Sequence, residues 1–81
     1  MKTFHLTIAK VGENLFDGEV ISVSFSGVEG VCEVLAEHEA FVSELRIGKI
    51  RAKTPDGVTH CFDTPHGGIA EVSRNQATIL I

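Results

Sequence analysis

Alternation of apolar and polar side chains runs through most of this chain and constrains its fold more than any other feature. Phe4, Leu6 and Ile8 alternate with polar neighbours, and the run from 21 to 26 alternates apolar residues with serine. Successive side chains of a β-strand point to opposite faces, so a period of two is typical of half-buried strands. No stretch longer than about ten residues shows the period of an amphipathic helix.

Turn-forming residues divide the alternating runs into short pieces. The breaks are Gly12, Gly27–Gly30, Gly48, Pro55–Gly57, Pro65–Gly68 and Arg74–Asn75. Turn residues at this spacing are typical of antiparallel sandwiches and barrels. The sequence therefore predicts an all-β fold, an antiparallel β-sandwich or flattened barrel of about nine or ten short strands. With 81 residues, we expect one domain covering 1–81.

The charge distribution argues against a nucleic-acid-binding protein. The formal net charge is −4, and the seven basic residues are spread from Lys2 to Arg74. The densest basic group is Arg46, Lys49, Arg51 and Lys53. Within it Arg51 and Lys53 alternate with Ile50 and Ala52, which indicates the solvated outer face of a strand. We therefore expect no nucleic-acid partner.

Features of membrane insertion and export are also missing from the sequence. No apolar run approaches the roughly 20 residues that span a bilayer, and the first residues lack the apolar centre of a signal peptide. The two cysteines, Cys32 and Cys61, do not suggest an exported disulfide scaffold. We expect the chain in the cytoplasm, or on the equivalent side of an energy-converting membrane, with both thiols reduced.

A metal site would have to use Cys32, His38, His60, Cys61 and His66, the most plausible ligands in the chain. Zinc sites usually contain closely paired ligands, and the two cysteines here are far apart in sequence. His60 and Cys61 are adjacent, so on a strand they point to opposite faces. We predict no metal ligand.

Nucleophilic catalysis and phosphate binding have equally weak support. Cys32, His38 and Asp63 have no local motif that would link a nucleophile to its base. Gly67-Gly68 precedes a strand and not a helix, so these glycines indicate a turn or bulge that only glycine tolerates. We predict no catalytic residue and no cofactor, and expect the domain to act through its surfaces.

Several segments together resemble the N-terminal domain of the epsilon subunit of F-type ATP synthase, whose mitochondrial counterpart is called delta. In order, they are Phe4–Ile8, Leu15–Val20, Gly27–Gly30, Val34-Leu35 with His38, Gly67–Ile69, Glu71-Val72 and Thr78–Leu80. Each motif alone is weak, but their order and spacing are specific. The resemblance implies the β-sandwich domain of a non-catalytic rotor subunit.

The chain departs from the family pattern in one stretch. The family usually has glycine at the position of Glu33 and proline-glycine at the positions of Ala36 and Glu37. It often has proline where Phe41 stands. Family members also typically continue into two C-terminal helices that inhibit ATP hydrolysis. Because this sequence stops at Ile81, we expect the helical hairpin and its inhibitory switch to be absent.

The resemblance also implies partners, the gamma subunit and the membrane c-ring, between which the domain transmits rotation driven by protons or sodium ions. It assigns one loop to the c-ring: Gly27, Val28, Glu29, Gly30, Val31 and Cys32. Glu29 would pair with a basic group, while Val31 and Cys32 would supply apolar contact. It assigns four residues to the gamma side: His38, Ala40, Phe41 and Val42. Membrane association would be peripheral, through the complex.

Two alternatives remain open from the residues themselves. A carbohydrate- or peptide-binding sandwich would expose an aromatic platform, yet the chain has no Trp or Tyr and five Phe. An enzyme or metalloprotein would bring Cys32, His38 and His66 together.

Overall fold

The alternating segments all form strands. The structure, a computed structural model, describes residues 2–81. Eight strands follow one another, and no helix occurs among the described residues: β1 (Phe4–Lys10), β2 (Glu13–Val20), β3 (Ser22–Gly27), β4 (Gly30–Leu35), β5 (Phe41–Lys53), β6 (Thr59–Thr64), β7 (Gly68–Ser73) and β8 (Gln76–Leu80).

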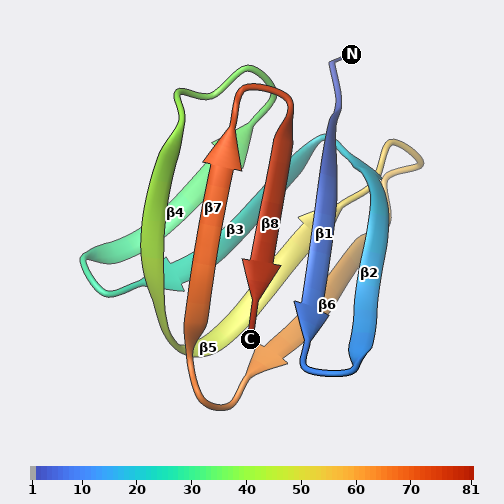
Figure 1. Ribbon diagram of the computed structural model, residues 1–81. Coiled ribbons are helices and arrows are strands. Elements are labelled where there is room, and N and C mark those ends of the chain that lie inside the picture. The colour runs from blue at the N-terminus through green and yellow to red at the C-terminus, as the bar shows by residue number, and fades with distance from the viewer. Residues whose placement is uncertain (1) are drawn as a thin grey trace.

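The strands belong to one hydrogen-bonded sheet that curls into two layers. The sheet runs in the order β2-β1-β8-β7-β5-β3-β4, and β6 pairs with β5 off this path. Figure 1 shows β7, β8, β1 and β2 in front, with β4, β3 and β6 behind them. The long strand β5 passes from the front layer to the back layer, so it links the two.

One continuous apolar core fills the space between the layers, and the alternating positions supply it. The fourteen buried hydrophobic residues are Phe4, Leu6, Ile8, Val20, Val23, Phe25, Val34, Leu45, Ile50, Ala52, Ala70, Val72, Ala77 and Ile79. Their intervening neighbours point outward, as in β1, where every second residue is buried up to Ile8. The sequence pattern thus specifies which face of each strand is buried.

The predicted all-β sandwich class is confirmed, with two differences in detail. The structure has eight described strands where the turn pattern suggested about nine or ten. The turn pattern predicts a strand break at Gly48, but this residue lies inside the 13-residue strand β5. In addition, β1 and β8 pair in parallel, whereas every other pair of strands is antiparallel.

Strand β5 bends at a corner that a buried threonine holds together. Leu45 pairs with β7 and Gly48 pairs with β6, so Arg46 and Ile47 lie between the two ladders. The Thr64 hydroxyl accepts a hydrogen bond from the Gly48 amide at 2.8 Å and donates one to the Arg46 carbonyl at 2.9 Å. Thr64 is the single buried polar residue among those described, and both of its bonds are made at this corner.

Aromatic side chains close the side of the sandwich where β2 and β6 face each other. The ring of Phe16 on β2 lies 5.6 Å from the His60 ring and 6.0 Å from the Phe62 ring, measured between centroids. No ladder joins β2 to β6 in the described sheet. Side-chain packing therefore covers these two strand edges without hydrogen bonds between them.

Candidate interaction site

The residues considered for metal binding or catalysis lie apart from one another. Cys32 is half-buried against the core, and His38 is exposed in the loop between β4 and β5. His60 faces Phe16 while Cys61 is exposed, so the predicted opposite orientation of these neighbours is confirmed. Within residues 2–81, no group of three His, Cys, Asp or Glu side chains is arranged to hold an ion.

Phenylalanines do not form a binding platform on this domain. Phe4 and Phe25 are buried, and Phe16, Phe41 and Phe62 are partly buried against the core. The alternative of an aromatic ligand-binding face therefore lacks the feature that it requires.

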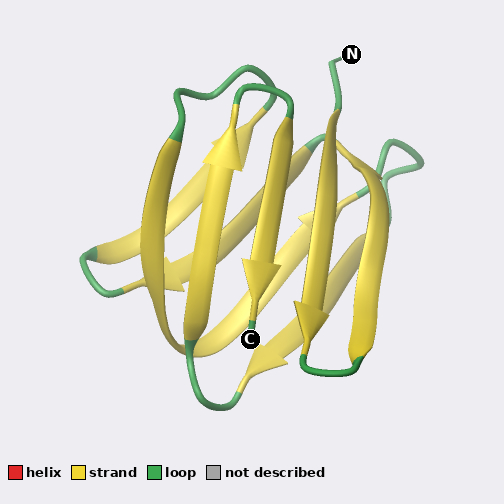
Figure 2. Ribbon diagram, viewed as in Figure 1, coloured by secondary structure: helices red, strands yellow, loops and turns green. Residues whose placement is uncertain are grey.

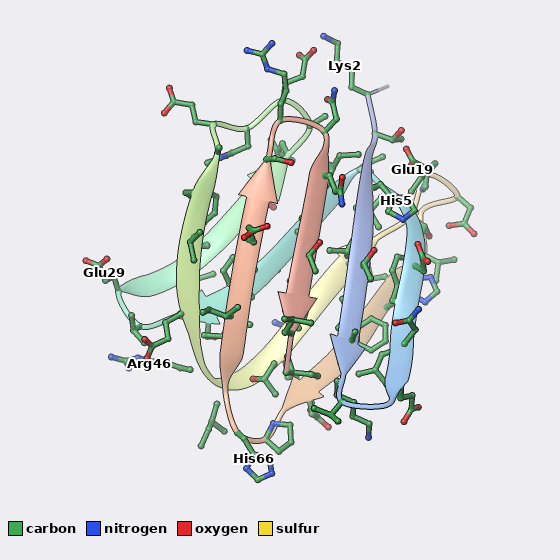
Figure 3. The ribbon with its side chains drawn as sticks, viewed as in Figure 1. Lys2, His5, Glu19, Glu29, Arg46 and His66 are labelled. Carbon is green, nitrogen blue, oxygen red and sulfur yellow. The ribbon has the colours of Figure 1, made fainter. Side chains whose placement is uncertain are left out.

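A cavity lies at the end of the sandwich near Ile81. It has a volume of about 410 Å³, and its lining is Lys10, Leu15, Asp63, Pro65, His66 and Ile81. Asp63 is engaged by the Lys49 ammonium at 2.7 Å. Figure 3 shows His66 at the turn between β6 and β7, apart from the Glu29 loop. The cavity contains no cysteine or serine nucleophile.

The loop assigned to the c-ring forms the tip of the β3–β4 hairpin. Gly27 pairs with Gly30, so Val28 and Glu29 form a two-residue turn that projects at one end of the molecule (Figure 2). Val28, Glu29 and Val31 are exposed, Val31 by 80%. Cys32 faces the opposite side of β4 and packs against the core, so its thiol does not join Val31 in one apolar surface.

Two hydrogen bonds fix the hairpin tip to the corner of β5. The Val28 amide donates to the Glu44 carbonyl at 3.0 Å, and the Arg46 guanidinium donates to the Val28 carbonyl at 3.1 Å. Figure 3 shows Glu29 and Arg46 at the same end of the molecule. The corner therefore sets the position of the loop, and the role of Arg46 was not apparent from the sequence.

The loop assigned to the gamma side joins β4 to β5 at another part of the molecule. His38 donates from Nδ1 to the Glu39 carbonyl over 2.8 Å, and its ring lies 5.0 Å from the Phe41 ring. The Phe41 side chain packs against the core, whereas Val42 is 64% exposed. Val42 points outward from the front layer and Val31 from the back layer, so the two predicted surfaces are distinct.

Glu37 adopts a backbone conformation that favours glycine. Its φ angle is 65°, and it is the only described non-glycine residue with a positive φ. Its amide donates to the Arg74 carbonyl at 3.0 Å, and its carboxylate binds the Lys2 ammonium at 2.8 Å. A hydrogen bond from Lys2, reinforced by its charge, lowers the pKa of Glu37 below the usual range. These contacts hold in place a loop that lacks the glycine of the family pattern.

A histidine between two carboxylates joins β1 to β2 on the outer face of the front layer. His5 Nε2 contacts Asp17, and Nδ1 lies 3.2 Å from Glu19 (Figure 3). The hydrogen bond to Asp17, with a smaller one to Glu19, raises the pKa of His5 despite a partly opposing loss of hydration. This cluster is not apparent from the sequence, because its three members meet only through the β1–β2 pairing.

Within residues 2–81 there is no helix with the length and apolarity needed to cross a membrane.

Comparison with known proteins identifies relatives along almost the whole chain. The family described as "ATP synthase, Delta/Epsilon chain, beta-sandwich domain" matches residues 3–81. The ATP synthase epsilon chain of Caulobacter vibrioides is 39% identical over 99% of this chain and 91% of its own length. The epsilon chain of Nitratiruptor sp. is 38% identical over 100% of this chain, which spans 62% of that protein.

Solved structures show the same fold. A chain in the cryo-EM structure of Euglena gracilis mitochondrial ATP synthase (OSCP/F1/c-ring) superposes with a TM-score of 0.89 at 25% identity. The match covers 96% of this chain and 49% of that chain. A chain in the central stalk/c-ring structure of Tetrahymena thermophila mitochondrial ATP synthase gives a TM-score of 0.78 at 13% identity, which is a likeness of fold alone. It covers 98% of this chain and 63% of that chain.

Proposed function

This chain belongs to the ATP synthase delta/epsilon β-sandwich family, and from this premise we propose that it is a rotor part of an F-type ATP synthase. In this role it links the gamma subunit to the c-ring and transmits rotation during proton- or sodium-driven ATP synthesis. The family is a non-catalytic subunit of its complex. The observation that carries the proposal is the family match over residues 3–81, supported by an epsilon-chain relative at 39% identity.

The physical build of the domain suits a part that transmits torque. Its two layers share one dense core, and packed protein interiors resist deformation. The tip of the β3–β4 hairpin is tied to the β5 corner through Glu44 and Arg46. A force applied at the tip would therefore pass into the sheet, since no flexible linker lies between them.

We assign the hairpin tip to the c-ring and the β4–β5 loop to gamma. Val28, Glu29 and Val31 offer an exposed acidic and apolar surface at the tip. His38 and Val42 offer a second exposed surface at the β4–β5 loop. Through these partners the domain is part of a complex on an energy-converting membrane, and we infer that it lies on the cytoplasmic face.

Replacing Val31 with aspartate tests the ring-facing assignment. A charge at an apolar contact must lose its hydration on assembly, so Val31→Asp is expected to weaken association with a gamma–c-ring preparation at least about tenfold. Val31 is 80% exposed, so the isolated domain should keep its melting temperature. Affinity is measured by titration with the purified complex, and melting by circular dichroism.

Val58→Asp is the matched control, because Val58 is 48% exposed in the β5–β6 turn, away from the tip. It should assemble like the unchanged protein. Equal binding by both variants would contradict the assignment of Val31 to the ring surface. If the unchanged domain bound neither the gamma subunit nor the c-ring, the proposed rotor function itself would be refuted.

A further inference from the structure

Strand β4 presents an uncovered edge of the sheet. It is the last strand on its side and pairs only with β3 among the described strands. The edges of β2 and β6 differ, because Phe16, His60 and Phe62 pack between them. Unpaired strand edges offer backbone donors and acceptors to another extended chain.

The hairpin geometry identifies the backbone groups that face this edge. In an antiparallel pair, hydrogen-bonded and non-hydrogen-bonded residue pairs alternate. The two-residue turn makes Gly27 and Gly30 a hydrogen-bonded pair, so Cys32 and Val34 also bond to β3. The backbone groups of the intervening residues, Val31, Glu33 and Leu35, therefore point away from β3.

A hydrogen bond on the other side of β3 agrees with this alternation. The amide of Val28, the turn residue directly after β3, donates to the Glu44 carbonyl of β5 at 3.0 Å. Even-numbered positions of β3 therefore bond toward β5, and odd-numbered positions such as Phe25 bond toward β4, opposite Cys32. The hydrogen bonds that β3 makes to β4 and to β5 thus lead to the same conclusion: the Glu33 amide points outward, away from β3.

The side chains at the same three positions limit what can pair with the edge. Val31 is 80% exposed and Leu35 is 55% exposed, with the exposed carboxylate of Glu33 between them. Two copies of β4 paired antiparallel about their centre would place Glu33 opposite Glu33, and like charges directly opposite destabilise a sheet. The edge is thus suited to a different strand, one with a Lys or Arg opposite Glu33 and apolar residues on either side.

We propose that the free edge of β4 receives an extended segment of the gamma subunit as an added strand. The inference rests on the proposed function and gives it a specific contact. The edge joins the two surfaces assigned above, since Val31 lies at the hairpin tip and β4 leads to the loop that contains His38. A gamma segment paired along β4 would run from the β4–β5 loop, assigned to gamma, toward the hairpin tip, assigned to the c-ring. Main-chain hydrogen bonds supply affinity in this mode, and alternate side chains supply specificity.

Residue-resolved amide hydrogen exchange tests the strand addition directly. In the free domain the amides of Val31, Glu33 and Leu35 should exchange fast, while those of Cys32 and Val34 exchange slowly because they bond to β3. Binding of purified gamma subunit should slow exchange at the three outward positions at least about tenfold. Unchanged exchange at these positions in a formed complex would overturn the proposal.

Proline at position 33 separates the backbone contact from the charge. Glu33→Pro removes the charge and, among the backbone donors, only the outward one, so the β3 ladder is kept, as prolines on edge strands allow. Glu33→Ala removes the charge and keeps the donor. We expect Glu33→Pro to bind gamma at least about tenfold more weakly than Glu33→Ala, a difference of about 1.4 kcal/mol.

Equal affinities of the two variants would refute strand addition while leaving the rotor function in place. If the unchanged domain failed to bind gamma, the proposed rotor function and the proposed strand addition would both be refuted. Should the proline variant not fold by near-ultraviolet circular dichroism, the exchange data on the unchanged domain decide the question.

Discussion

Gly67 shapes the corner of the sandwich through the side chain that it lacks. Its φ angle is +74°, and a Cβ atom there would lie 2.5 Å from the Leu45 carbonyl oxygen. Its amide donates to the Thr64 carbonyl at 3.2 Å, next to the bend in β5. The sequence had indicated a backbone requirement at Gly67-Gly68 and not a phosphate loop. That interpretation is confirmed by the turn that these residues form between β6 and β7.

Gly67→Ala should therefore destabilise the domain by about 3 kcal/mol or more, because it adds backbone strain and a clash with fixed backbone. For a domain of this size the melting temperature should fall by more than about 10 °C. Gly12→Ala is the control, since Gly12 has a φ of +80° with no atom within 4 Å of the added Cβ. It should cost about 1 kcal/mol. Equal melting temperatures for the two variants in calorimetry would contradict the close approach at Leu45.

At the scale of the strands, the alternating pattern predicts well which residues are buried, but it does not predict which strands lie side by side. Phe4, Leu6 and Ile8 are buried as their spacing indicates. The same pattern says nothing about which distant strand lies beside β1, so the parallel pairing with β8 was not predicted. The pattern predicts a break at Gly48 because glycine often ends a strand, whereas here the chain bends and continues.

The candidate site was predictable to a similar extent. The two turn glycines located the hairpin tip, and the alternation itself could have placed Cys32 on the inner face, opposite Val31. The contact of Arg46 with the tip depends on the bend in β5. Thr64 was equally hidden, because its two partners at the bend come from another strand.

Thr64→Val tests whether this threonine holds the corner. Valine keeps the shape but removes both hydrogen bonds, leaving the Gly48 amide and the Arg46 carbonyl without their partner. Denaturant unfolding should show a loss of about 1–3 kcal/mol, and the Gly48 amide should exchange faster. Thr64→Ser keeps the hydroxyl and should lose about 0.8 kcal/mol with the methyl group. If the Thr64→Val variant were as stable as the Thr64→Ser variant, the corner would not depend on the hydroxyl group.

At the scale of the whole molecule, exposed clusters of charged side chains surround an apolar core, and the buried polar side chains that the structure describes all have hydrogen-bond partners. No described buried side-chain nitrogen or oxygen lacks a hydrogen-bond partner. The described ion pairs, such as Lys49–Asp63 and Lys2–Glu37, lie on the surface, where water and salt weaken them. The fold therefore depends chiefly on the core, while the surface clusters make its stability depend on pH.

The free energy of unfolding should be highest in a window between the titrations of Glu37 and His5. The lowered pKa of Glu37 gives stability above its ordinary pKa, which is lost as the pH falls through the lowered value. The raised pKa of His5 gives stability below about 6.5, which is lost as the pH rises through the raised value. Denaturant unfolding from pH 3 to 9 should therefore show a shallow maximum on the acid side of neutrality, flatter at high salt. His5→Gln should remove the decline near neutral pH and leave the acid limb unchanged, since Glu37 lies in another cluster. A decline that persisted in this variant would assign the titration to a group other than His5.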